Sequence, residues 1–236
     1  MVTNATYIVD DGIAIARLLQ RLGRWDDALS LLPERDAGAV AVRAEILVDR
    51  FFWRLDRPEP ALNAITALEP DDPVPAGFLR AQVAYTRLVF DLDPEPDAAA
   101  QARAGFTAAA TDDRLTGWAT FWLGVLADMV DKDPGAAGGH YERALSTARE
   151  TRDALLESYA IRHQGVHLVQ ADREAGVGLL RRSYHLRAAL GARPQTAAAA
   201  ATLADELPAG AEAAELRKTA ALTARELQLT WLLRAL

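Results

Sequence analysis

The side chains best suited to chemistry lie on one predicted helix over residues 153–170, where Tyr159, His163 and His167 recur every fourth residue. At about 100° per residue, the three fall within a sector of about 80°. Two histidines one turn apart can chelate a transition metal, and an imidazole beside a tyrosine can exchange protons near neutral pH. Glutamine follows His163, so the His-Glu-x-x-His metal motif is absent, and Asp128 is only a candidate further ligand. We therefore favour a structural histidine pair with hydrogen-bonded ring nitrogens over a ligand-binding pair, and we rank catalysis last.

The first helix of the preceding predicted hairpin carries a tryptophan stripe, with Arg114, Trp118 and Trp122 again spaced by four residues. If stacking aligns the two helices, the tryptophans come close to Tyr159 and His163. Such an arginine-edged aromatic wall suits an apolar or planar ligand, or a peptide side chain. A tryptophan stripe at helical spacing is also the pattern of a buried core, and we favour internal packing for at least one of the two.

Arginines also recur on earlier predicted helices, among them Arg43, Arg80 and Arg87. Because a guanidinium group binds carboxylates in a bidentate fashion, such a ladder could face an acidic ligand or a peptide carboxylate. Acidic neighbours such as Glu45 favour a solvated or internally paired face instead. The ligand-binding candidates from the sequence are Arg87, Arg114, Trp118, Trp122, Tyr159, His163 and His167.

Composition excludes several other kinds of chemistry. The chain has no cysteine, which excludes disulfides, zinc–thiolate sites and thiol catalysis. It lacks a phosphate-binding glycine loop, a Gly-x-Ser-x-Gly motif and acidic clusters that would hold magnesium or calcium, so we predict no cofactor, no metal site and no catalytic residue. A net charge of -7 and a pI near 5.2 oppose binding to nucleic acid.

The sequence also indicates where the protein resides. The amino end has no basic segment followed by an apolar core, and no run approaches the roughly 18 apolar residues that span a bilayer. Together with the absence of cysteine, this predicts a soluble, cytoplasmic protein with no membrane partner.

A recurring turn organises the chain. Its markers, each between two apolar helical stretches and 33 to 40 residues apart, are Gly23, Asp56, Asp93, Asp133 and Asp172. This is the period of stacked helical hairpins, and no stretch alternates at period two long enough to argue a strand. We therefore predict an all-α fold and one domain over residues 1–236. The predicted hairpins span about residues 7–32, 37–68, 76–110, 112–149 and 152–190, followed by helices over 194–207 and about 211–236.

The residues around these turns form a pattern. Its clearest parts are Ala16 followed by Gly23-Arg24-Trp25-Asp26-Asp27-Ala28, Gly124 with Asp131 and Ala136, and Arg162-His163-Gln164-Gly165 with Asp172 and Ser183. The first two resemble the tetratricopeptide signature, and the third resembles repeats of large actinobacterial transcriptional regulators and of free-standing proteins of similar composition. The resemblance implies a right-handed α-solenoid of about five to six antiparallel hairpins, whose first helices line a concave binding surface. Asp49 and Thr86 depart from the pattern, because small residues are expected near those positions.

The predicted last helix, over about residues 211–236, becomes apolar on nearly every face toward its end. A solenoid needs a terminal cap with a polar outer side. This helix therefore either folds back over the preceding hairpins or meets another chain, as in a two-fold homodimer. The interface candidates are Leu229, Trp231, Leu232, Leu233 and Leu236.

Taken together, the sequence favours a non-catalytic binding scaffold or regulator that recognises a protein, a peptide or an apolar small molecule. The alternative is an enzyme or a ligand-sequestering protein with a pocket around Trp118, Trp122, Tyr159, His163 and His167. Direct DNA contact is disfavoured by the charge and by the lack of an identifiable recognition helix.

Overall fold

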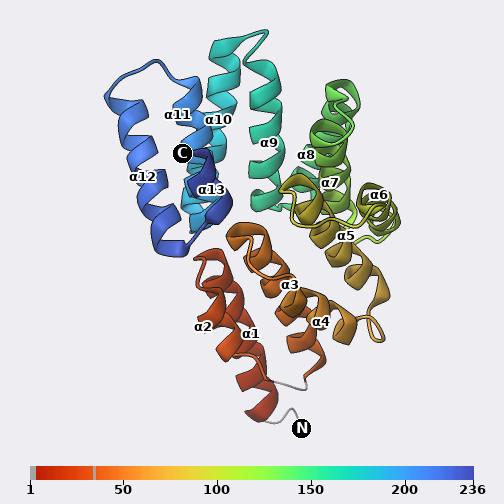
Figure 1. The fold of residues 1–236 in the computed structure, drawn as a ribbon. Helices are drawn as coiled ribbons and strands as arrows, with labels where there is room; N and C mark the ends of the chain where they lie inside the picture. Colours follow the sequence, from red (N-terminus) through yellow and green to blue (C-terminus); the bar gives the residue numbers. More distant parts are fainter. Residues whose placement is uncertain (1–3, 34–35) are drawn as a thin grey trace.

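The computed structural model describes residues 4–33 and 36–236, with side chains from residue 11 onward (Figure 1). Within these residues it contains thirteen helices and no strand, which confirms the predicted all-α fold. The helices are α1 (Asn4–Arg21), α2 (Trp25–Ser30), α3 (Ala37–Arg54), α4 (Glu59–Leu68), α5 (Pro73–Val89), α6 (Ala98–Ala109), α7 (Thr116–Met129), α8 (Pro134–Thr151), α9 (Ala154–Leu168), α10 (Arg173–Ala189), α11 (Arg193–Glu206), α12 (Ala211–Leu227) and α13 (Thr230–Ala235). In the described part of the chain, no helix is long and apolar enough to cross a membrane.

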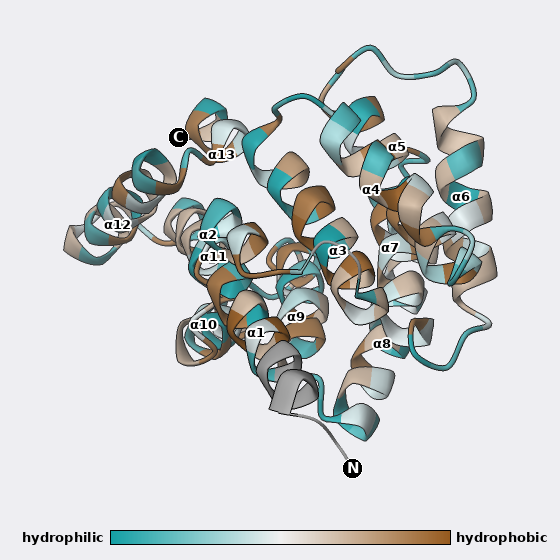
Figure 2. Ribbon diagram, turned by 90° about the horizontal axis from the view of Figure 1, so that it is seen from below, coloured by the Kyte–Doolittle hydropathy of each residue, from teal (hydrophilic) through white to brown (hydrophobic). Residues whose placement is uncertain are grey.

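Successive helices pack against one another, and the odd-numbered ones form a continuous layer. Contacts run from α1 to α3, α5, α7 and α9 in turn, while each even-numbered helix packs on the helix before it. The chain thus follows an arc from α1 through α6 to α12 in Figure 1. The largest apolar cluster extends from α3 to α9, and Figure 2 shows apolar residues gathered where α3, α5 and α7 meet.

The five turn markers of the sequence all lie between an odd-numbered helix and the even-numbered helix that follows it. Gly23 adopts a left-handed φ of 75°, which glycine tolerates without steric cost and which ends α1. Asp133 and Asp172 cap α8 and α10 by accepting the backbone N–H groups of Ala136 and Ala175. The turns are therefore specified locally.

The close approach of α9 and α10 depends on a glycine. A Cβ atom on Gly176 would lie 2.7 Å from the backbone nitrogen of Val169 and 2.9 Å from the carbonyl oxygen of Gly165. Both contacts are with backbone, which cannot move aside as a side chain can. In contrast, a Cβ atom on Gly178 in the same helix would meet nothing within 4 Å.

We expect Gly176→Ala to lower the free energy of unfolding by about 1–3 kcal/mol, because the methyl group forces the two helices apart. Gly178→Ala is the matched control and should raise it by about 0.5–1 kcal/mol through helix propensity. Urea unfolding followed by circular dichroism measures both. Equal effects of the two substitutions would contradict the tight contact.

The carboxyl-terminal segment corrects the prediction of one helix over about residues 211–236. Helix α12 ends at Leu227, Gln228 adopts a left-handed φ of 59°, and α13 begins at Thr230. The break turns α13 onto α3, where the rings of Trp231 and Trp53 stack with centroids 5.5 Å apart. A straight continuation of α12 would not make this contact, and the apolar residues after the break would lose their burial.

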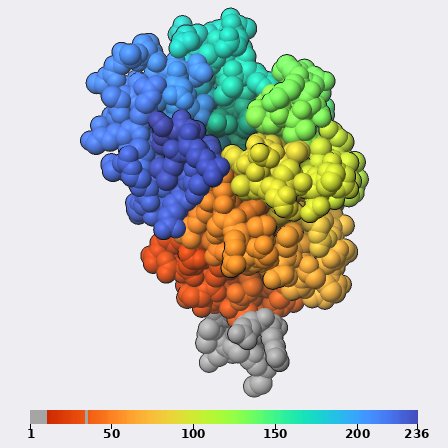
Figure 3. All heavy atoms as spheres, in the orientation of Figure 1, coloured from red at the N-terminus to blue at the C-terminus, as the bar shows by residue number. Residues whose placement is uncertain are grey.

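The interface candidates fall into two groups. Leu229 and Leu232 are buried inside the chain and Trp231 is half-buried, whereas Leu233 and Leu236 are 41% and 49% exposed. The buried residues belong to one apolar cluster that joins the first three helices to the last three. In Figure 3 the last helices, in dark blue, touch the orange part of the chain. Early and late helices therefore meet within one molecule.

Candidate functional site

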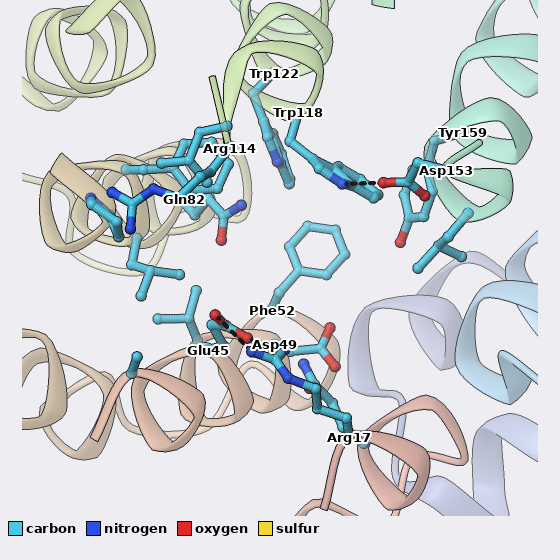
Figure 4. Close-up of a pocket in the computed structure, with 18 of the residues that line it drawn as sticks. Arg17, Glu45, Asp49, Phe52, Gln82, Arg114, Trp118, Trp122, Asp153 and Tyr159 are labelled. Atoms are coloured by element: carbon cyan, nitrogen blue, oxygen red, sulfur yellow. Dashed lines mark hydrogen bonds and ion pairs between the residues drawn. The ribbon is translucent and has the colours of Figure 1, made fainter. Parts of the chain in front are cut away.

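A cavity of about 630 Å³ lies on the layer of odd-numbered helices (Figure 4). Helices α1, α3, α5, α7, α9 and α11 all contribute side chains to its wall. Its polar and aromatic lining includes Arg17, Glu45, Asp49, Phe52, Gln82, Arg114, Trp118, Trp122, Asp153, Tyr159 and Gln195. The volume falls within the roughly 300–1,000 Å³ that is usual for small-molecule sites.

The aromatic side of the cavity comes mainly from α7 and α9. Trp118 and Tyr159 meet edge to face with ring centroids 5.3 Å apart, and Trp122 meets Phe52 in the same way at 6.1 Å. The indole Nε1–H of Trp122 is buried and has no acceptor among the described residues. Buried donors are normally satisfied, so this indole is an exception in the aromatic wall.

Two carboxylates at the cavity are held by indole groups. Asp49 accepts hydrogen bonds from Nε1 of Trp25 at 2.8 Å and from Nε1 of Trp53 at 3.0 Å. Asp153 accepts one from Nε1 of Trp118 at 2.9 Å, as Figure 4 shows. Burial raises the pKa of Asp49 to about 6, although the indole donors oppose the shift. Within the described residues, neither carboxylate forms an ion pair.

Two of the three arginines that line the cavity are already paired. Arg114 contacts Asp72 at 2.9 Å and Asp112 at 2.8 Å, and Arg17 pairs with Glu45. These carboxylates neutralise the guanidinium groups, so the expected arginine edge of the aromatic wall presents little free positive charge. The arginines of the predicted ladder also have partners within the chain: Arg80 pairs with Glu69, Arg87 pairs with Glu95, and Arg43 donates to the carbonyl of Leu32.

The structure separates the two histidines from the cavity. Nε2 of His167 lies 2.9 Å from Oδ2 of Asp128, and Nδ1 of His163 lies 3.9 Å from the same atom. The hydroxyl of Tyr141 donates to it at 3.1 Å. This cluster joins α7, α8 and α9, and neither histidine lines the cavity. Of the five residues in the predicted pocket, only Trp118, Trp122 and Tyr159 line the cavity.

Burial and mutual contact set the charges of this cluster. Burial lowers the pKa of His163 to about 4, and the nearby Asp128 opposes the shift. The imidazoles of His163 and His167 hold the pKa of Asp128 low, at about 2, although burial opposes them. In the part of the chain that the structure describes, no group of three or more histidine or carboxylate side chains is placed to hold a metal ion.

Arg87, the remaining ligand-binding candidate, does not line the cavity; it lies in the last turn of α5, and its side chain reaches the turn between α5 and α6. Its Nε donates to the carbonyl of Leu92 at 3.2 Å, and its guanidinium also contacts the carbonyl of Asp93 and the carboxylate of Glu95. These contacts hold the turn together, so the side chain has a structural role there.

Sequence reasoning missed several cavity residues. Phe52 and Gln195 carried no motif, and Asp153 had only the signal of a helix cap, a role it also fills by accepting the N–H of Leu156. Asp49 did carry a signal, because it stands near a position where the repeat pattern expects a small residue. That departure marks a side chain that points into the cavity.

Comparison with known proteins assigns no family, because the chain matches no family model, no curated protein and no solved structure. The functional conclusion therefore depends on the cavity and on the residues that form it.

Proposed function

We propose that this chain is a non-catalytic binding protein that holds a small molecule in the cavity of about 630 Å³. The observation that carries the proposal is how the cavity is built. Helices α1, α3, α5, α7, α9 and α11 all contribute to one wall, which combines aromatic rings with polar and charged groups. Small-molecule sites have this composition and are usually formed before the ligand arrives.

The proposal includes the finer architecture. We propose a right-handed, tetratricopeptide-like solenoid in which the first helix of each hairpin faces the ligand, and a cytoplasmic role as a regulator or adaptor. Support comes from the paired helices, from the turn at Gly23 and its aspartate counterparts, and from a cavity on the odd-numbered helices. In a regulator of this kind, ligand binding in the cavity would change the affinity of another surface for a protein or peptide partner.

We also propose that the protein forms a homodimer, through fewer residues than the sequence indicated. Because Leu229 and Leu232 are buried inside the chain, a homodimer would use the exposed Leu233 and Leu236. A native mass spectrum distinguishes the states directly. A monomer at micromolar concentration would exclude this dimer, and a dimer that Leu233→Glu dissociates would support it.

The binding function predicts that filling the cavity removes the ligand. Ala41 lines the cavity from α3, and Ala41→Phe should place a ring in the ligand's space. The exposed Ala100 on α6 provides the matched control, Ala100→Phe. After incubation with a cell extract, native mass spectrometry should show a small-molecule adduct on the wild type and on the control but not on Ala41→Phe. An adduct that Ala41→Phe retains would contradict the proposed site.

A further inference from the structure

We propose that the ligand of the cavity is an organic cation, an amine or a guanidine, whose charge faces Asp49 and Asp153 and whose carbon skeleton packs on the aromatic wall. This inference rests on the proposed binding function of the same cavity. In Figure 4 the Asp49 carboxylate, the Tyr159 hydroxyl and the Phe52 and Trp118 rings face one common space. That space is where the cation would lie.

The charges around the cavity leave a negative excess. Four carboxylates line it, and the arginine pairs described above neutralise two of them. Asp49 and Asp153 keep only neutral hydrogen-bond partners within the described residues. A carboxylate withdrawn from water but not paired with a cation raises the free energy of the empty site. A cationic ligand would remove that cost, whereas an anion would add to it.

Two other arginines near the cavity do not reverse this balance. Arg21 lines the cavity at its rim and, with Arg152 and Asp153, also lines a second hollow; its side chain is exposed, so water screens its charge. Arg187 is 2% exposed and lies 4.3 Å from the centroid of the Tyr159 ring. It does not line the cavity; its Nε and Nη1 donate to Ser158 and to the Gln195 carbonyl, and its Nη2 has no partner among the described residues. Neither arginine is among the hydrogen-bond partners of Asp49 or Asp153 in the described residues, so both carboxylates remain available to a ligand's charge.

The aromatic rings favour the same ligand class. A cation over the face of a tryptophan, tyrosine or phenylalanine is attracted by the ring quadrupole, most strongly where water is excluded. Trp118, Trp122, Tyr159 and Phe52 surround the space in front of the carboxylates. The combination of aromatic faces with unpaired carboxylates selects an organic cation over both a neutral ring and a metal ion.

The indole groups supply the readout. The chain has five tryptophans, and ¹⁵N-labelled protein gives one indole N–H signal for each. Trp118 and Trp122 line the cavity, and the indoles of Trp25 and Trp53 donate to Asp49. The probes are benzylammonium, benzyl alcohol and phenylacetate, which share a ring and differ in charge. Benzylammonium should shift the Trp118 and Trp122 signals at millimolar concentration and bind most tightly.

A pair of capping aspartates provides the matched variants. Asp153 caps α9 at the cavity and Asp172 caps α10 away from it, each by accepting a backbone N–H. Asparagine retains the capping oxygen, but it removes the charge together with the oxygen that accepts the Trp118 indole. Asp153→Asn should weaken benzylammonium binding roughly tenfold, the value of a charge-assisted hydrogen bond. Benzyl alcohol binding reports the effect of the lost Trp118 hydrogen bond and should weaken less than benzylammonium binding, and Asp172→Asn should change neither.

The pH dependence tests Asp49 without a substitution that would strand Trp25 or Trp53. The groups that face Asp49 are neutral near pH 6: these two indoles, Gln20, and the hydroxyl of Tyr159, whose pKa burial raises above its usual value. Because its pKa is about 6, acidification below that value protonates the carboxyl and should weaken benzylammonium binding. Benzyl alcohol, which carries no charge, should bind equally on both sides of pH 6.

The outcomes separate the two proposals. Benzyl alcohol or phenylacetate binding as tightly as benzylammonium would overturn the cation and leave the cavity as a ligand site. No shift of the Trp118 or Trp122 signal with any probe would overturn both. A pentapeptide with lysine between glycines distinguishes the source of the cation. If the pentapeptide binds and benzylammonium does not, the cation that enters the cavity is a side chain of a partner protein.

Discussion

Leu232→Ala is expected to lower the free energy of unfolding by about 2–5 kcal/mol, whereas Leu233→Ala should change it by less than about 0.5 kcal/mol. The two leucines are adjacent on α13 but face different surroundings, with exposed fractions of 2% and 41%. Truncating Leu232 removes apolar contacts and leaves a cavity, while truncating Leu233 does neither. Urea unfolding of the two variants measures the difference.

This comparison tests how the chain closes on itself. Leu232 belongs to the cluster that includes Trp25 and Trp53, so its loss would loosen the junction between the first and the last helices. If both variants had small effects, α13 would not pack on α3 in solution. A larger loss for Leu233→Ala would show that the exposed face of α13 is covered by a partner.

Much of the architecture could be predicted from the sequence because its signals are local. Gly23 adopts a left-handed conformation that suits glycine, and two of the turn aspartates, Asp133 and Asp172, satisfy amides three residues ahead, whatever the rest of the chain does. The break at Gln228 could not be predicted in this way. Its cause is the contact between α13 and α3, which are distant in the sequence.

The cavity was only partly predictable, because it depends on which side chains the packing turns toward one another. Asp49 and Arg50 look self-compensating as neighbours in the sequence. The structure instead pairs Arg50 with Asp26 and Asp56 and leaves Asp49 to two indoles. Adjacent side chains on a helix point about 100° apart, so they rarely pair with each other.

The same argument applies to Tyr159 and His163. One helical turn separates them, and the sector of about 80° that they share with His167 suggested one pocket. The structure divides that sector, because Tyr159 meets Trp118 while His163 lies against the ring of Tyr141 with centroids 4.7 Å apart. Only the placement of α8 decides where the division falls, and the position of α8 is a property of the packed fold.

His163 gives the second large prediction, a loss of stability on acidification. Burial lowers its pKa in the folded state to about 4, whereas an unfolded histidine has a pKa of about 6.5. As the pH falls from 6.5 to 4, the unfolded chain takes up a proton that the folded chain excludes. The stability that neutral His163 retains at pH 7 is therefore lost across this window, by up to about 3 kcal/mol.

The measurement is a difference between variants, since other groups titrate in the same range. Asp49, whose folded pKa is raised to about 6, contributes stability below its unfolded pKa that is lost as the pH rises, the opposite sign to His163. Urea unfolding of the wild type and of His163→Gln from pH 7 to 4 cancels this common term. The stability of the wild type relative to the variant should fall as the pH falls.

The lower limit of the titration follows from Asp128. Its pKa of about 2 depends on His163 and His167, so below pH 4 the substitution would alter two titrations at once. Above that pH the carboxylate stays charged and the difference reports the imidazole. His185→Gln, at an exposed position on α10, is the matched control and should keep the wild-type profile. A constant difference between wild type and His163→Gln across the window would show that the folded protein admits the proton, and that His163 is not enclosed between α7, α8 and α9.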